Sequence, residues 1–186
     1  MLKVAERRSM IRGTFTALMA MFAAHLGVLG TAAVGQSTSG TVESTPLATS
    51  IVVEKRAHRM TVYHGDRVLR RFQVALGRGG LAPKMRQGDR RVPEGSYFIS
   101  GSNPRSSYHL SLRISYPTAE QVAAAAARGD KAGGDIMIHG LPNGRGAIGA
   151  NHLKRDWTDG CIAVTNAEIE WLWAAVPDGT PIHIRP

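Results

Sequence analysis

The sequence predicts a mainly β domain, either a β-sandwich or a partly open barrel, with two or three short α-helices. Short apolar runs separated by Gly, Pro and Asp occur along most of the chain. Helical patterns with start signals are few, and they do not alternate regularly with the strands. With 186 residues, 43% hydrophobic and 20% charged, the chain has the size and composition of one globular domain.

Runs rich in Val, Ile and aromatic residues and bounded by turn residues predict the strands. These runs are 51–53, 60–63, 68–76, 95–100, 108–116, 136–138, 161–164 and 181–184. Two longer segments rich in glycine, 77–93 and 140–160, are expected to be loops.

Two helices have sequence signals at their starts. Thr118 with Gln121 forms a capping-box pattern before a run of alanines, and Gly129 is expected to end that helix. Thr165 with Glu168 repeats the pattern and predicts a helix that reaches about residue 176.

The N-terminus has the pattern of an export signal. The first twelve residues are basic, no charged residue occurs from 13 to 42, and small residues precede Gln36. We therefore predict that residues 1–35 are a signal peptide, or alternatively an uncleaved N-terminal membrane anchor. Residues 36–49, rich in Ser, Thr and Gly, are expected to be a flexible linker before a domain at 50–186. An exported chain would work in the cell envelope.

The formal charge of +9 has two sources. Four basic residues belong to segment 1–35, and eight lie between Arg67 and Arg91 beside a single acid, Asp89. Because an exported protein does not meet chromosomal DNA, we expect no nucleic-acid partner. Membrane contact is expected only through the N-terminal segment if it is not cleaved. An anionic wall polymer or membrane face is one partner for the basic segment, and a solvated surface is the other interpretation.

Cys161 is the single cysteine, which excludes an intrachain disulfide and any zinc site with two or four cysteines. Thr158, Asp159 and Gly160 form a turn that delivers Cys161 to the start of a strand. Backbone N–H groups at Gly160 and Cys161 would suit an oxyanion. His139 ends another strand, and Gly140 lets the chain bend away from the imidazole. A thiol beside a histidine base is a usual nucleophile in acyl transfer.

Other interpretations of these residues stay open. Cys161 is also compatible with a small buried hydrophobic residue, and His139 with a structural role. His152, Asp156 and Asp159 would permit a metal site together with Cys161 and His139. Since no tight ligand spacing occurs, we expect no metal and no cofactor.

The segments around these residues resemble a known family. His139-Gly140, the turn Thr158-Asp159-Gly160-Cys161-Ile162, and the stretch 89–95 before a strand are similar to the L,D-transpeptidase catalytic domain, also called YkuD, in its periplasmic YafK-like branch. The resemblance covers about residues 51 to 186. It implies a YkuD-like fold, Cys161 as the acyl-enzyme nucleophile, His139 as its base, peptidoglycan stem peptides as substrate and no cofactor. Two residues depart from the family pattern: Asp159 stands where a second His is common, and Ala163 where Arg or Asn often follows.

The resemblance favours an exported periplasmic cysteine acyltransferase that forms a Cys161 thioester. Two alternatives remain: a hydrolase or amidase that trims stem peptides or releases wall-linked protein, and a non-catalytic wall-binding module that uses its basic segment. Arg145, Trp157 and His109 are candidate substrate contacts or structural residues. Asp159 either orients His139 or shapes the turn.

Overall fold

The computed structural model describes residues 46–186. The predicted signal peptide or anchor at 1–35, and residues 36–45 of the expected linker, lie outside this range. Within it, Ala48 is buried and its N–H donates to the carbonyl of Ala175 at 2.8 Å. None of the helices between residues 46 and 186 has the length and apolar character needed to cross a membrane.

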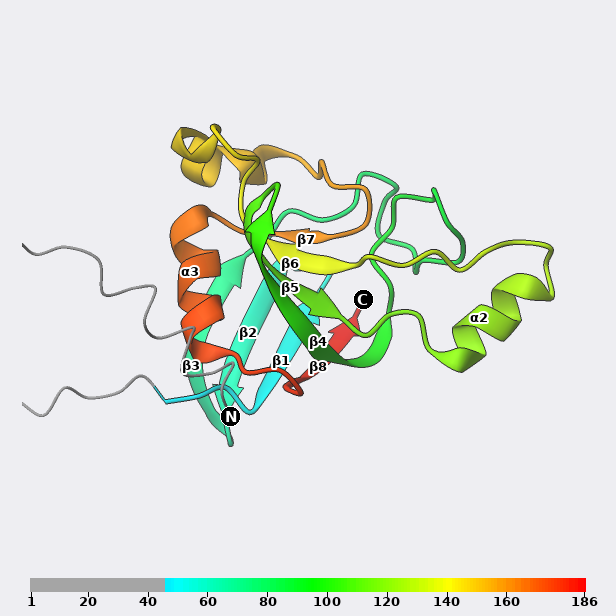
Figure 1. Cartoon of the computed structure of the whole chain (residues 1–186), viewed down its shortest axis with the longest axis horizontal. Helices are drawn as coiled ribbons and strands as arrows, with labels where there is room; N and C mark the ends of the chain where they lie inside the picture. The colour runs from blue at the N-terminus through cyan, green and yellow to red at the C-terminus, as the bar shows by residue number, and fades with distance from the viewer. Residues whose placement is uncertain (1–45) are drawn as a thin grey trace, which may run out of the picture. The chain divides into compact units, whose positions relative to one another are not determined.

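Within residues 46–186, eight strands form one curled sheet in the order β3-β2-β1-β8-β4-β5-β6-β7 (Figure 1). The strands are β1 (Ser50–Glu54), β2 (Arg59–His64), β3 (Arg67–Gln73), β4 (Gly95–Ser106), β5 (His109–Ile114), β6 (Met137–His139), β7 (Ile162–Ala163) and β8 (Pro181–Arg185). The pairs β1–β8 and β6–β7 are parallel, and the other neighbours are antiparallel.

The strand β4 joins the two halves of the sheet. Residues 95–98 of β4 pair with β8, whereas residues 99–106 pair with β5 through two irregularities in register. Irregular register increases local twist and bends a strand. The predicted strand 95–100 is therefore too short. Its extension carries Ser102, which pairs with Leu112 of β5, and Pro104, a poor strand residue that lies in the irregular stretch between Asn103 and Ser106.

The chain after β3 brings the two edges of the sheet together. The predicted strand 68–76 ends earlier, at Gln73, and the following residues leave β2. Ala75 forms a bridge with Ala163 of β7, and Gly77 forms one with Thr158. Because β3 and β7 are the opposite edges of the sheet, these bridges make it a partly open barrel. The predicted mainly β fold is confirmed.

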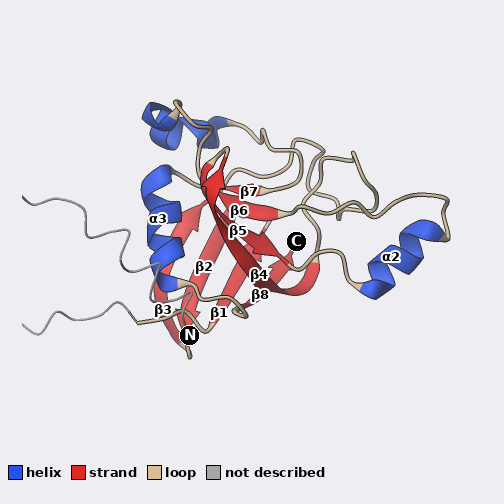
Figure 2. Ribbon diagram, in the orientation of Figure 1, coloured by secondary structure: helices blue, strands red, loops and turns tan. Residues whose placement is uncertain are grey.

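Two α-helices begin where the sequence predicts (Figure 2). In α2 (Ala119–Ala126) Thr118 and Gln121 form the complete capping box, and in α3 (Asn166–Ala175) Thr165 and Glu168 do the same. Ile169 and Leu172 of α3 are fully buried in the core, and the tilted ring of Trp171 packs against Phe72 of β3 with centroids 5.5 Å apart.

Part of the loop predicted at 140–160 is a 3₁₀ helix, η1 (Gly146–Lys154), which makes a third helix (Figure 2). It consists of two turns separated at Gly149, whose φ of +50° lies in the left-handed region. The glycines that predicted a loop are thus compatible with tight helical turns.

Candidate active site

The parallel pair β6–β7 places the predicted nucleophile and base on one face of the sheet. Ile138 pairs with Ile162 and His139 with Ala163. Because side chains alternate along a strand, the two isoleucines enter the core, while Met137, His139 and Cys161 point to the other face. These three residues line one cavity of about 340 Å³. The structure therefore brings Cys161 and His139 together.

The imidazole of His139 is buried, with 4% of the residue exposed, and has a fixed orientation. Its Nδ1 lies 2.7 Å from the carbonyl oxygen of Gly140. Since a carbonyl oxygen only accepts, Nδ1 carries the hydrogen and Nε2 is left as a proton acceptor. Burial lowers the pKa of His139, the charge of His152 lowers it further, and the bond to Gly140 opposes this. His139 is thus neutral near pH 7.

Close packing explains the glycine that follows His139. A Cβ at Gly140 would lie 2.8 Å from Oδ1 of Asn166 and 3.0 Å from Cγ2 of Ile169. Its N–H also donates to the carbonyl of Tyr108 at 3.1 Å. Gly140 therefore positions its carbonyl for His139 in a space that no larger residue fits.

Aromatic rings shield the imidazole. The ring of Tyr108, from the β4–β5 turn, lies 4.4 Å from that of His139, and the ring of Trp157 lies 5.6 Å away at a steep angle. Both residues line the cavity. Trp157 is a predicted substrate contact, and the structure places it in the lining of the cavity that holds Cys161.

The thiol of Cys161 is protonated at rest. Burial raises the pKa of Cys161, and the charges of Asp135 and Asp159 raise it further, whereas a hydrogen bond from the Met137 backbone and the charge of Lys84 lower it. The Sγ donates to the carbonyl of Asp135 at 3.5 Å. A neutral thiol beside a neutral imidazole requires proton transfer during the reaction.

Thr158 fixes the turn that presents Cys161. Its Oγ1 donates to the carbonyl of Cys161 at 2.7 Å and accepts from the N–H of Gly160 at 3.2 Å. Gly160 has a φ of +126°, and a Cβ there would lie 2.9 Å from the carbonyl oxygen of Arg91. Because Thr158 engages the Gly160 amide, the Cys161 amide is the better candidate of the two for an oxyanion.

The segment after β3 holds this turn from the other side. Ala75 and Ala163 exchange two backbone hydrogen bonds, at 3.0 and 2.8 Å. Thr158 donates to the carbonyl of Leu76 and accepts from the N–H of Arg78, at 3.1 and 3.0 Å. Cys161 thus lies in a stretch bonded on both sides, which limits its movement.

Asp159 takes part in surface ion pairs. Its carboxylate lies 2.8 Å from Nη2 of Arg78 and 3.5 Å from Nε of Arg90, and its side chain is 71% exposed. The group that orients His139 is instead the carbonyl of Gly140. The contacts of Asp159 are those of a residue that stabilises the turn.

The other residues considered for a metal site have separate partners. Asp156 binds Nε2 of His58 at 3.0 Å and the N–H of Leu76 at 2.7 Å. His152 accepts a long hydrogen bond of 3.5 Å from the indole of Trp157. These contacts hold the chain segments beside the cavity.

Two predicted substrate contacts lie outside the cavity. His109 pairs through Nε2 with Glu170 at 2.7 Å, and the exposed Arg145 precedes the 3₁₀ helix. The cavity is lined instead by the β4–β5 turn and the stretch before β6. Its lining residues that the sequence did not single out are Asn103, Arg105, Ser106, Ser107, Tyr108, Asp135 and Met137. Tyr108 lies in the predicted strand 108–116. The alternation of side chains along a strand does not indicate that Tyr108 lies beside His139.

Comparison with known proteins agrees with this fold. The family model of the L,D-transpeptidase catalytic domain, YkuD, matches residues 48–184. YafK of Escherichia coli (strain K12), which is provisionally named an L,D-transpeptidase, is 31% identical over 136 residues. That match covers 70% of this chain and 47% of YafK, so the chain spans about half the length of this curated relative.

Solved structures share the fold at low sequence identity. The helical cell shape determining protein Pgp2 of Campylobacter jejuni has a TM-score of 0.55 and 21% identity, covering 76% of this chain and 51% of Pgp2. An L,D-transpeptidase fragment of Xylanimonas cellulosilytica has a TM-score of 0.50 and 18% identity, covering 75% of this chain and 61% of the fragment. With the family model matching most of its length, this chain belongs to the YkuD family of L,D-transpeptidase catalytic domains.

Proposed function

We propose that this protein is an exported cysteine acyltransferase that forms a thioester between Cys161 and a peptidoglycan stem peptide. The family acts on such peptides, which supports the substrate class. The observation that carries the proposal is the common cavity of Cys161 and His139, in which the imidazole is neutral and has its Nδ1 engaged by Gly140.

The acylation step begins with proton transfer. His139 accepts the Sγ proton of Cys161 at Nε2, and the resulting thiolate attacks a peptide carbonyl carbon. The tetrahedral intermediate then collapses as the C–N bond breaks. The imidazolium returns the proton to the leaving amine, so the neutral imidazole is restored and the acyl group remains on sulfur.

The second step releases the acyl group. An acceptor amine attacks the thioester carbonyl, gives up a proton through His139, and expels the sulfur as a restored thiol. Water in place of the amine would give hydrolysis by the same steps. The N–H of Cys161 is the proposed donor to the oxyanion in both steps.

Intact-protein mass spectrometry with stem peptides tests the proposal. Wild-type protein, without its N-terminal 35 residues, is expected to gain the mass of an acyl group, and Cys161→Ala is expected to gain none. Analysis of the released peptides distinguishes joined products from cleaved ones. If Cys161→Ala retains all wall-modifying activity, the thioester mechanism is wrong. Wall binding without any adduct would instead support a binding module that uses the basic segment 67–91.

We also propose that the chain is exported to the periplasm by residues 1–35. The basic and then uncharged sequence of this segment supports export. Fusion of residues 1–45 to a reporter that is active only outside the cytoplasm tests it. Activity that survives replacement of the uncharged core by charged residues would contradict the proposal.

A further inference from the structure

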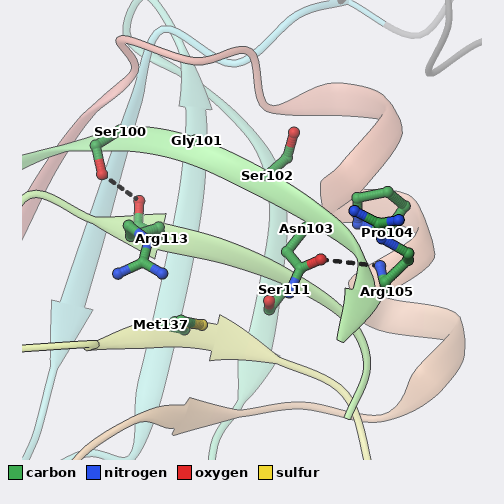
Figure 3. A pocket seen from close by; sticks show the side chains of 9 residues that line it. All are labelled: Ser100, Gly101, Ser102, Asn103, Pro104, Arg105, Ser111, Arg113 and Met137. Atoms are coloured by element: carbon green, nitrogen blue, oxygen red, sulfur yellow. Dashed lines mark hydrogen bonds between the residues drawn. The ribbon is translucent and has the colours of Figure 1, made fainter. Parts of the chain in front are cut away.

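A second cavity lies beside the candidate active site, on the same face of the sheet. Its volume is about 570 Å³. Figure 3 shows the side chains that line it. It shares Asn103, Arg105 and Met137 with the cavity that holds Cys161. The described residues that line it are Ser100, Gly101, Ser102, Asn103, Pro104, Arg105, Ser111, Arg113 and Met137. A substrate whose reacting carbonyl lies at Cys161 would therefore extend into this cavity.

Sheet register connects the second cavity to the catalytic residues. Ser111 of β5 pairs with His139 of β6, and Arg113 pairs with Met137. Paired residues on antiparallel strands point to the same face. The side chains of Ser111 and Arg113 therefore lie on the same face of the sheet as those of His139 and Met137. Figure 3 shows Ser111, Arg113 and Met137 on these adjacent strands.

The charge of this cavity is positive. Arg105 and Arg113 are its charged lining residues, and no carboxylate side chain from residues 46–186 lines it. Half of the Arg113 side chain is exposed, and its guanidinium pairs with Asp135, which is 79% exposed. An ion pair this exposed is weak, so a second carboxylate can share or replace it. A guanidinium offers a planar fork that suits a carboxylate.

Ser111 provides an independent sign of a ligand. Its residue is 1% exposed, and its Oγ has no hydrogen-bond partner within the part of the chain that the structure describes. A buried hydroxyl without a partner costs free energy, and such groups in proteins usually have one. A polar ligand atom at the floor of the cavity would supply the missing acceptor.

We propose that this cavity is a subsite for a free carboxylate of the peptide substrate, held by Arg113 and Ser111 beside the nucleophile. This inference rests on the proposed function and adds to it the charge that the substrate must carry. Asp135 competes with the substrate for Arg113. Its own carbonyl accepts from the Cys161 thiol, so the subsite and the nucleophile share one chain segment.

The test compares a stem tetrapeptide with free carboxylates against the same peptide with its carboxylates amidated. The catalytically silent Cys161→Ala protein is used, with binding measured by calorimetry, and the wild-type acylation rate is measured in parallel. The free peptide is expected to bind about tenfold or more tightly, as charge-assisted hydrogen bonds contribute. Equal affinities for the two peptides overturn the subsite.

Variants test which residues cause the preference for the peptide with free carboxylates. Arg113→Gln is expected to bring the two peptides to similar affinities, and Ser111→Ala to reduce the preference about threefold. Asp135→Asn removes the competitor and is expected to increase the preference. Arg56→Gln, in the turn between β1 and β2, changes the net charge equally and should leave the preference unchanged. A preference that survives in Arg113→Gln, or that falls equally in Arg56→Gln, overturns the assignment.

Failure of the subsite and failure of the proposed function have different signatures. If both peptides acylate the wild-type protein at equal rates, the thioester mechanism is supported and the subsite proposal is wrong. If no adduct forms on Cys161 but the peptide with free carboxylates binds the Cys161→Ala protein more tightly, the subsite proposal is supported and the proposed acyl transfer is wrong.

Discussion

The rings of Tyr108 and His139 lie 4.4 Å apart, so a residue from the β4–β5 turn covers the proposed base. Burial is the main reason why the pKa of His139 lies below its usual value. The neutral imidazole therefore depends on a side chain that is remote in sequence and itself 39% exposed.

Replacement of Tyr108 by Ala tests this dependence. Loss of the ring hydrates the imidazole, so we expect the pKa of His139 to rise towards its ordinary value. Because the base acts in its unprotonated form, the acid limb of the pH profile of the acylation rate should move to higher pH. Tyr108→Phe keeps the ring and should keep the profile. An unchanged acid limb in Tyr108→Ala would show that the ring does not set this pKa.

Thr158 is expected to act as a positioning residue for Cys161. Thr158→Val retains the shape but removes the hydroxyl that bonds both Gly160 and Cys161. We expect the acylation rate to fall about tenfold to a hundredfold, since the turn loses two hydrogen bonds. Thr158→Ser keeps the hydroxyl and should stay within about threefold of wild type. Equal losses in both variants would instead implicate the methyl group.

Gly140 is expected to tolerate no side chain. In Gly140→Ala the new Cβ would lie 2.8 Å from Oδ1 of Asn166, so we expect a loss of about 1–3 kcal/mol in the free energy of unfolding. Gly134→Ala is the matched control, because a Cβ at this position would have no neighbour within 4 Å and the φ of Gly134 is not left-handed. Urea unfolding of the two variants measures the difference. Similar stabilities would contradict the close packing around Gly140.

Asp89 is expected to make stability depend on pH in the acid range. Burial acts to raise its pKa, but the N–H groups of Arg86, Met85 and Arg91 and the ammonium of Lys84 lower it to about 2. A lowered folded-state pKa stabilises the fold above the unfolded-state pKa, and this contribution disappears as the pH falls towards 2.

Replacement of Asp89 by Asn is therefore expected to cost about 1–2 kcal/mol in the free energy of unfolding at pH 7. The difference from wild type should shrink between about pH 4 and pH 2. Unfolding in urea at several pH values measures it. A difference that stays constant over this range would show that the carboxylate charge does not contribute.

The local elements could be predicted from the sequence. Thr118 with Gln121 and Thr165 with Glu168 start their helices as expected, because a capping box is completed within four residues. Leu112 and Ile114 alternate along β5, and both are buried in the core. These features can be predicted from the sequence because they depend on residues that are close together along the chain.

The lining of the candidate site could not be predicted in the same way. His109 and Tyr108 are adjacent, yet Tyr108 covers His139 while His109 pairs with Glu170. Which of them enters the cavity depends on the end of the β4–β5 pair, where the register is irregular. Arg145 lies outside because the glycine-rich segment forms a 3₁₀ helix.

The sequence by itself determined the family, the capped helices, and a single cysteine and a histidine, each beside a glycine. The tertiary structure decided that β6 and β7 are parallel and in a register that puts Cys161 and His139 in one cavity. It also decided that Ser111 and Arg113 lie beside them. The physical reason is that strand pairing joins residues far apart in the chain, and a shift of one residue would turn each side chain to the opposite face.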